Sequence, residues 1–157
     1  MPLNEAQTSR VWQLMVEAEV RSYYFGDLAS RFTRQKQIIT GLSFFLSSGA
    51  AATIAARLYW APLISASIAA GLTAYSIAAG LDRRAGEMAQ LHHDWAMLSS
   101  DYERLWHHWY EEDADSRLAE IQRRDGEVSR KSTEAPYDRS LLDKWQDRVN
   151  DLRGVTA

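Results

Sequence analysis

The stretch IITGLSFFLSSGAAATIAARLYWAPLISASIAAGLTAYSIAAGL, residues 38–81, contains a single charged side chain, Arg57. The rest of the chain carries the other 17 Lys and Arg and all 21 Asp and Glu. The segments 38–56 and 60–81 on either side of Arg57 are long enough as helices to span roughly 30 Å, about one hydrocarbon core. The pattern favours two transmembrane helices joined by a tight turn. A soluble hairpin buried in a helical core is the alternative.

The turn between the two segments reads AARLYWAP, residues 55–62. Tyr59 and Trp60 carry the amphipathic rings that are typical of a membrane interface. Pro62 suits the first turn of a helix, where its missing N–H costs nothing. We therefore expect Arg57 at the outer rim of the hairpin, where its side chain can reach headgroups or water.

Basic residues flank the hairpin on both sides: Arg31, Arg34 and Lys36 precede it, and Arg83 and Arg84 follow it. The positive-inside rule then places both termini of this two-span protein in the cytoplasm and the turn outside. The polar start MPLNEAQTSR lacks the apolar core of a signal peptide, so no cleavable signal is expected. The absence of cysteine fits a protein facing the cytosol.

Heptad spacing predicts a long helix after the hairpin. Apolar residues recur at alternating intervals of three and four, at Met88, Leu91, Trp95, Leu98, Tyr102, Leu105 and Trp109. The N-terminal segment has a weaker matching series, at Val11, Met15, Ala18, Ser22, Phe25, Ala29 and Phe32. We expect the two helices to pack antiparallel and to continue into the hairpin without a break, with Gly86 as the weak point.

The chain is therefore expected to be all-α: a two-span hairpin extended by long cytosolic helices that resemble a coiled coil, in a symmetric oligomer. The expected parts are an N-terminal cytosolic helix (1–36), the hairpin (37–81), a cytosolic helical extension (82–128), and a linker with a C-terminal amphipathic helix (129–157). Within the last two parts we expect a polar break at 111–116 and a short helix at 118–128. A linker with a turn at 129–138 and a final helix at 140–153 should follow. The predicted apolar face of the final helix consists of Leu142, Trp145, Val149 and Leu152.

Small polar residues recur along one side of each apolar segment. The candidates for lining a pore are Thr40, Ser43 and Ser47 in the first segment, and Ser65, Thr73 and Ser76 in the second. The structural alternative is close packing of helices through small residues four apart, such as Ser67 and Gly71. Because one hairpin has too few helices to enclose a channel, a pore requires an oligomer.

The basic flanks allow two interpretations. As topology determinants, Arg31, Arg34, Lys36, Arg83 and Arg84 would meet anionic headgroups. Repeated around a symmetric oligomer, they would form a positive collar able to bind the phosphates of an anionic signal. A second group of basic residues, Arg123, Arg124, Arg130 and Lys131, is predicted to be a solvated surface.

Residue types that support catalysis or metal binding are sparse. The chain has no glycine-rich phosphate loop, no nucleophile elbow and no cysteine, so we expect neither an enzyme nor a cofactor. His92–His93 and His107–His108 would lie about 22 Å apart on a continuous helix, so a zinc site would need several subunits. We expect the histidines to flank the apolar seam and to pack against Trp95, Trp106 and Trp109; titration near neutral pH is open to them.

The stretch RSYYFGDLASRFTRQKQIITGLSFFLSSGAA, followed by a short-loop hairpin and LDRRAGEMAQLHHDWAMLSSDYERLW, resembles the SLATT family of bacterial two-span membrane proteins. The resemblance covers roughly residues 21–112. It implies an oligomeric membrane effector of antiphage defence, controlled by a nucleotide or oligonucleotide signal and causing abortive infection by depolarising the inner membrane. The resemblance implies that such effectors are typically encoded beside a nucleotidyltransferase or a nucleotide-sensing domain. The version most compatible with a chain this short is the two-gene Hailong type, in which an oligonucleotide product gates a channel.

Three functions follow from these observations. The first is a homotetrameric channel gated at its cytosolic helices, with the tetramer taken from the family. The second is a membrane-anchored coiled-coil scaffold without pore activity. The third is a soluble helical adaptor. Subunit count, ion selectivity and the identity of the signal are not encoded in any motif of the chain.

Overall fold

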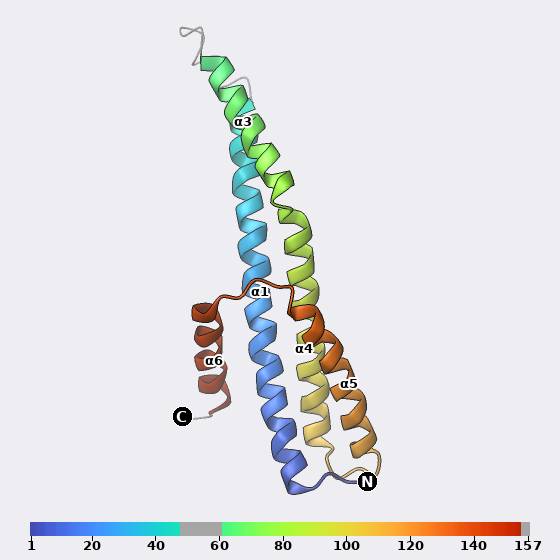
Figure 1. Ribbon diagram of the computed structural model, residues 1–157. Helices are drawn as coiled ribbons and strands as arrows, with labels where there is room; N and C mark the ends of the chain where they lie inside the picture. The colour runs from blue at the N-terminus through green and yellow to red at the C-terminus, as the bar shows by residue number, and fades with distance from the viewer. Residues whose placement is uncertain (48–60, 155–157) are drawn as a thin grey trace. The chain divides into compact units, whose positions relative to one another are not determined.

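The structure, a computed structural model, describes residues 1–47 and 61–154. Over those residues the chain is an all-α helical bundle without a strand, as predicted. Its helices are α1 (Glu5–Ser47), α3 (Ala61–Ala78), α4 (Leu81–His107), α5 (Ala114–Ser132) and α6 (Arg139–Arg153), shown in Figure 1. The chain forms two compact units, unit 1 (Met1–Asp27 with Met88–Ala157) and unit 2 (Leu28–Glu87), and both α1 and α4 contribute residues to each.

The core of unit 1 is built on the predicted heptad seam of α4. Six of the seven seam residues are at most 5% exposed: Met88, Leu91, Trp95, Leu98, Tyr102 and Leu105. The seventh, Trp109, lies beyond the end of α4 and is 44% exposed. The facing series on α1 is buried at Val11, Met15, Ala18, Ser22 and Phe25. The seam prediction is confirmed up to the end of α4.

Helix α5 packs antiparallel to α4 within unit 1. The residue numbers of the contacts rise along one helix and fall along the other. Lys131 pairs with Asp94 at 3.2 Å, and Arg124 pairs with Asp101 at 2.6 Å. Buried Trp95 donates its indole N–H to the hydroxyl of Ser132 at 3.0 Å. The polar contacts line the edges of the apolar seam and fix the register of the two helices.

Helix α6 lies against α1, antiparallel to it (Figure 1). Trp145 stacks on Tyr23 with ring centroids 5.1 Å apart, and Arg153 pairs with Glu19 at 2.8 Å. The buried residues of α6 are Leu141 and Val149, one turn before and one turn after Trp145. The predicted face was wrong at Leu152, which is 59% exposed, whereas Leu142 and Trp145 are half-buried and Val149 is buried. Stacking on Tyr23 turns α6 so that positions four apart from Trp145 face α1.

The start of the chain closes the end of unit 1. The N–H of Leu3 donates to the carbonyl of Trp109 at 2.9 Å, and the ammonium group of Met1 bonds to the carbonyl of Glu112. Asn4 and Gln7 each accept the other's backbone N–H, which forms a capping box at the start of α1. With its loop held in this way, α5 begins at Ala114 and runs to Ser132, so the short helix predicted at 118–128 is longer at both ends.

Unit 2 contains the second half of α1, the whole of α3 and the start of α4 (Figure 1). Helix α1 passes through residues 32–38 unbroken, as predicted. The second segment was predicted to continue into the next helix without a break, and this prediction was wrong. The chain breaks at Gly80, whose φ of 58° is in the left-handed region that favours glycine. Gly86 lies inside α4. Helix α3 ends at Ala78, short of the predicted residue 81.

The structure describes only part of the predicted turn. Arg57, Tyr59 and Trp60 lie outside the described residues. Helix α3 begins at Ala61, which puts Pro62 in its first turn, as predicted.

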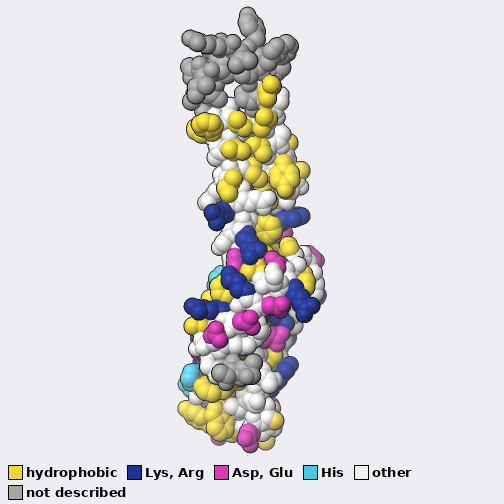
Figure 2. Space-filling view, turned by 90° about the vertical axis from the view of Figure 1, so that its left-hand side faces the viewer, with side chains coloured by type: hydrophobic (Ala, Val, Ile, Leu, Met, Phe, Trp, Pro, Cys, Tyr) yellow, Lys and Arg dark blue, Asp and Glu magenta, His cyan; other side chains and the backbone are white. Residues whose placement is uncertain are grey.

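Unit 2 exposes large apolar side chains along both of its longer helices. Those that are 49–76% exposed are Ile38, Leu42, Phe44, Phe45, Ile64, Ile68, Tyr75 and Ile77. Figure 2 shows such side chains gathered over this region without charge among them, and Lys and Arg side chains at its end. Among the described residues, no helix is both long and apolar enough to cross a membrane. The two predicted spans therefore stay a prediction.

Candidate functional site

The five predicted ligand-binding residues all belong to unit 2. Arg31, Arg34 and Lys36 lie on α1, and Arg83 and Arg84 lie on α4. An ion pair between Lys36 and Asp82 links the two groups of basic residues across the helices. The structure therefore brings together residues that are about 50 positions apart in the chain. We call these five residues the basic collar.

Acidic neighbours neutralise part of the basic collar within one chain. Lys36 pairs with Asp82, and Arg83 approaches Glu87 at 3.5 Å. The side chain of Arg83 is nevertheless 81% exposed, and Arg84 is also exposed. This part of unit 2 contains five basic residues and two acidic ones, so its net charge is positive. An anion binding here would meet exposed guanidinium groups, which suit bidentate contacts to phosphate.

The pore-lining candidates differ in their surroundings. Thr40 is exposed, whereas Ser43 and Ser76 are half-buried. The hydroxyl of Thr73 donates to the carbonyl of Ala69 at 2.9 Å, so its donor is used inside α3. Ser47 and Ser65 lie outside the residues whose side chains the structure describes. The candidates whose side chains are described lie on α1 (Thr40 and Ser43) and α3 (Thr73 and Ser76).

Of the four histidines, His107 packs against Trp106 as expected, whereas His92 contacts the backbone of α1 and His93 is exposed. His92 Nδ1 lies 2.8 Å from the carbonyl oxygen of Ser22 on α1, and the ring of His107 meets the edge of Trp106 at 5.1 Å between centroids. His108 Nδ1 lies 2.8 Å from the carbonyl of Arg104. In the part of the chain that the structure describes, no three His, Asp or Glu side chains are grouped so as to hold a metal ion.

The second basic group forms ion pairs along α5. Arg123 bonds to Glu120 at 2.7 Å, and Arg124 and Lys131 pair with acids of α4. The hydrogen bond from Arg123 lowers the pKa of Glu120, and the same contact raises the pKa of Arg123. Arg130 is exposed. The pairing supports the prediction of an ordinary solvated surface.

A cavity of about 480 Å³ lies between α4 and α5 and is lined by Arg104, Arg117 and Arg124 among others. These arginines are paired with acids of the same unit. Arg124 and Arg104 contact Asp101 at 2.6 and 3.9 Å, and Arg117 contacts Asp113 at 2.8 Å. An anion in this cavity would compete with carboxylates already in place, which makes it a weaker candidate site than the basic collar.

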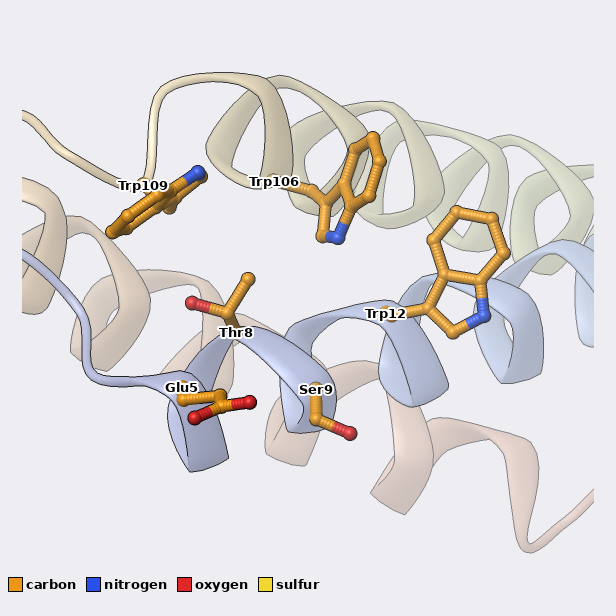
Figure 3. Close-up of a pocket in the computed structure, with 6 residues that line it drawn as sticks. All are labelled: Glu5, Thr8, Ser9, Trp12, Trp106 and Trp109. Carbon is orange, nitrogen blue, oxygen red and sulfur yellow. The ribbon is translucent and has the colours of Figure 1, made fainter.

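A larger cavity, of about 690 Å³, lies at the end of unit 1 where the chain starts. Its described lining consists of Glu5, Thr8, Ser9, Trp12, Trp106 and Trp109, drawn in Figure 3. We call it the tryptophan pocket. It combines residues from the first turns of α1 with residues from the end of α4 and the loop that follows. Sequence reasoning missed it, although the density of tryptophan and histidine at 106–109 marks this end of α4 as unusual.

Comparison with protein-family models, with curated proteins and with solved structures finds no match to this chain. The SLATT resemblance stays a prediction that rests on the residues quoted for it.

Proposed function

We propose that this chain is an oligomeric membrane channel of bacterial antiphage defence. In this proposal the hairpin of unit 2 is embedded in the inner membrane with both termini in the cytoplasm. A nucleotide or oligonucleotide from a separately encoded nucleotidyltransferase gates the channel at the basic collar, and opening depolarises the membrane.

The observation that carries the proposal is the contrast between the two units. Unit 1 buries its seam residues, as a water-soluble bundle does. Unit 2 leaves Phe44 at 74%, Ile77 at 76% and Phe45 at 60% exposed, in helical stretches (37–47 and 61–78) that carry no charged residue. Apolar surface of this extent is unfavourable in water and marks a surface that contacts lipid or protein. Helices satisfy their own backbone hydrogen bonds, so they suit a lipid environment.

The amino-acid sequence continues the uncharged run beyond the described residues. Residues 48–56 continue the uncharged run of the first segment up to Arg57. The basic collar follows at the opposite end of both segments, as the positive-inside rule expects of cytoplasmic flanks.

Small residues on α3 support assembly with other copies. Ala70, Gly71 and Ala74 are exposed, and a β-carbon placed on Gly71 would meet nothing within 4 Å. Within the described residues, their own chain therefore does not use them for close packing. Small residues at four-residue spacing let helices of neighbouring subunits approach closely in a bilayer. The tetramer, the defence role and the nucleotide signal come from the SLATT resemblance.

A membrane-anchored scaffold is the alternative. It is favoured by the ion pairs of Lys36 and Arg83, which leave the collar partly neutralised without any ligand. In that case unit 2 would only tether unit 1, and the pore-lining hydroxyls would serve helix packing, as Thr73 does within α3.

The deciding experiment measures ion flux through liposomes that contain the purified protein. We expect flux that changes when nucleotides or short DNA and RNA oligonucleotides are added on the side of the collar. Absence of flux with every ligand in the panel would reject the channel and leave the scaffold. Extraction of the protein from cells without detergent would reject both membrane functions.

A double variant tests the collar itself. Arg83→Glu with Arg84→Glu should abolish the response to ligand while leaving the oligomer intact in detergent. Arg139→Glu with Arg148→Glu makes the same charge change at exposed positions of α6 and should respond like the wild type. Equal gating in the two double variants would reject the collar as the ligand site.

A further inference from the structure

The tryptophan pocket has aromatic walls and one acidic residue. Trp12 and Trp106 lie with ring centroids 5.2 Å apart and their planes inclined at 52°, and Trp109 is 44% exposed. Figure 3 shows Trp109 and Trp106 on the two sides of an open space, with Thr8 of α1 directed towards it. In this view Glu5 and Ser9 lie on the other side of the α1 ribbon, at the edge of the pocket. Among the described residues that line the pocket, Glu5 is charged and none is Lys or Arg.

The indoles are more open than a purely structural cluster requires. Trp95, which belongs to the core of the same unit, is 1% exposed and uses its N–H in a bond to Ser132. Trp12 and Trp106 are only half-buried, and Trp109 is exposed. Exposed indole surface is costly in water, and here it faces a cavity of about 690 Å³, within the size range of ligand sites.

The backbone around the pocket is held in place. The carbonyl of Trp109 accepts the N–H of Leu3, a residue that is 3% exposed. The capping box of Asn4 and Gln7 then fixes the first turn of α1, which carries Glu5 and Thr8. The walls of the pocket are therefore preorganised, which lowers the entropic cost of binding a ligand.

The chemistry of these walls selects a cation. The face of an indole ring is electron-rich and attracts organic cations, and quaternary ammonium groups are recognised in this way. The carboxylate of Glu5 adds attraction for positive charge. A nucleotide would bring phosphates to a site with an acidic residue and no basic one. We propose that the tryptophan pocket binds a small organic cation of the quaternary ammonium class.

The pocket is independent of the basic collar. Its residues all belong to unit 1, whereas the collar belongs to unit 2. Unit 1 carries 19 Asp and Glu against 12 Lys and Arg, so its own field also favours a cationic ligand. The proposal stands whether or not the chain forms a channel.

The test compares choline with its neutral carbon isostere, 3,3-dimethylbutan-1-ol, on the full chain in detergent. Each tryptophan gives one indole N–H signal in a nitrogen-labelled sample. We expect choline to shift the signals of Trp12, Trp106 and Trp109 in a saturable way and to bind about tenfold more tightly than the isostere. Equal binding of the two compounds, or shifts centred on Trp95 and Trp145, would overturn the proposal.

Two variants and a control locate the site. Trp109→Ala should weaken choline binding by about tenfold, and Glu5→Gln, an exposed position, should weaken it several-fold. Tyr137→Ala changes an exposed ring outside the pocket lining and should bind choline as the wild type does. If Trp109→Ala fails to fold, Glu5→Gln alone tests whether choline binds at the tryptophan pocket. Choline affinity unchanged by Glu5→Gln at low salt would then reject the site.

Discussion

The imidazole of His92 on α4 occupies the space that a side chain at Gly26 on α1 would need. A β-carbon at Gly26 would lie 3.1 Å from Nδ1 of His92, closer than ordinary van der Waals contact. The same nitrogen lies 2.8 Å from the carbonyl oxygen of Ser22, so the ring is held against the backbone of α1. Glycine at this position lets the two helices of unit 1 approach.

The first prediction compares two helical glycines. Gly126→Ala on α5 should raise the free energy of unfolding by about 0.5–1 kcal/mol, because nothing lies within 4 Å of the new methyl group. Gly26→Ala should be about 1–2 kcal/mol less favourable than Gly126→Ala, because His92 must move. Urea unfolding followed by circular dichroism measures both. Equal gains in stability would show that the His92 side chain moves aside without loss of stability.

The second prediction concerns Tyr102, which donates its hydroxyl to Asp125 at 2.9 Å. Burial, and then the hydrogen bond and the charge of Asp125, raise the pKa of Tyr102 above its ordinary value. The folded state therefore keeps this proton at a pH where the unfolded chain loses it. The stability from this difference is fully present below about pH 10 and is lost as the pH rises further.

Tyr102→Phe removes this dependence. We expect it to cost about 1 kcal/mol near neutral pH through loss of the hydrogen bond, and to lose less stability than the wild type between pH 9 and pH 11. Tyr137→Phe, at a ring that is 75% exposed, is the control and should follow the wild type. Parallel pH profiles for all three proteins would contradict the prediction.

The third prediction tests the heptad seam. Leu98→Ala removes a side chain that is 2% exposed and should cost about 2–5 kcal/mol, because it leaves a cavity in the core of unit 1. Leu152→Ala makes the same chemical change at a residue that is 59% exposed and should cost less than about 0.5 kcal/mol. Thermal and urea unfolding of the two variants gives the comparison. Similar costs would mean that α6 packs differently from the structure.

The fourth prediction concerns the break between α3 and α4. Gly80 has a φ of 58°, so Gly80→Ala should destabilise the protein by about 1–2 kcal/mol. Gly80→Asn should be better tolerated, because asparagine adopts this conformation more readily than alanine does. Gly86→Ala, inside α4, should be neutral or stabilising. Melting temperatures in detergent rank the three variants, and a harmless Gly80→Ala would contradict the left-handed turn.

Local patterns in the sequence were enough to predict much of the fold. The spacing of Met88 to Leu105 predicted a buried seam, and the absence of a breaker between residues 32 and 38 predicted that α1 continues through them. The predicted linker and turn at 129–138 placed the final helix to within one residue of its observed start. Each of these features depends on residues fewer than about eight positions apart, where helix periodicity and propensity act.

Contacts between distant residues could not be predicted in the same way. The face of α6 that packs on α1 is set by Trp145 stacking on Tyr23. The helix breaks at Gly80 and not at Gly86, although either glycine can adopt the left-handed conformation. The partial neutralisation of the basic collar needs Asp82 to meet Lys36 across two helices. Neither the contacts nor the backbone conformation produces a periodic pattern in the sequence.

The sequence by itself determined that this chain is helical, that one region buries a heptad seam and that another is apolar and almost uncharged. Only the tertiary structure decided that Trp12 on α1 meets Trp106 on α4 beside Glu5, and so created the tryptophan pocket. The reason is physical. Helix formation is governed by neighbours within a turn or two, whereas a pocket forms where antiparallel helices bring together residues nearly a hundred positions apart.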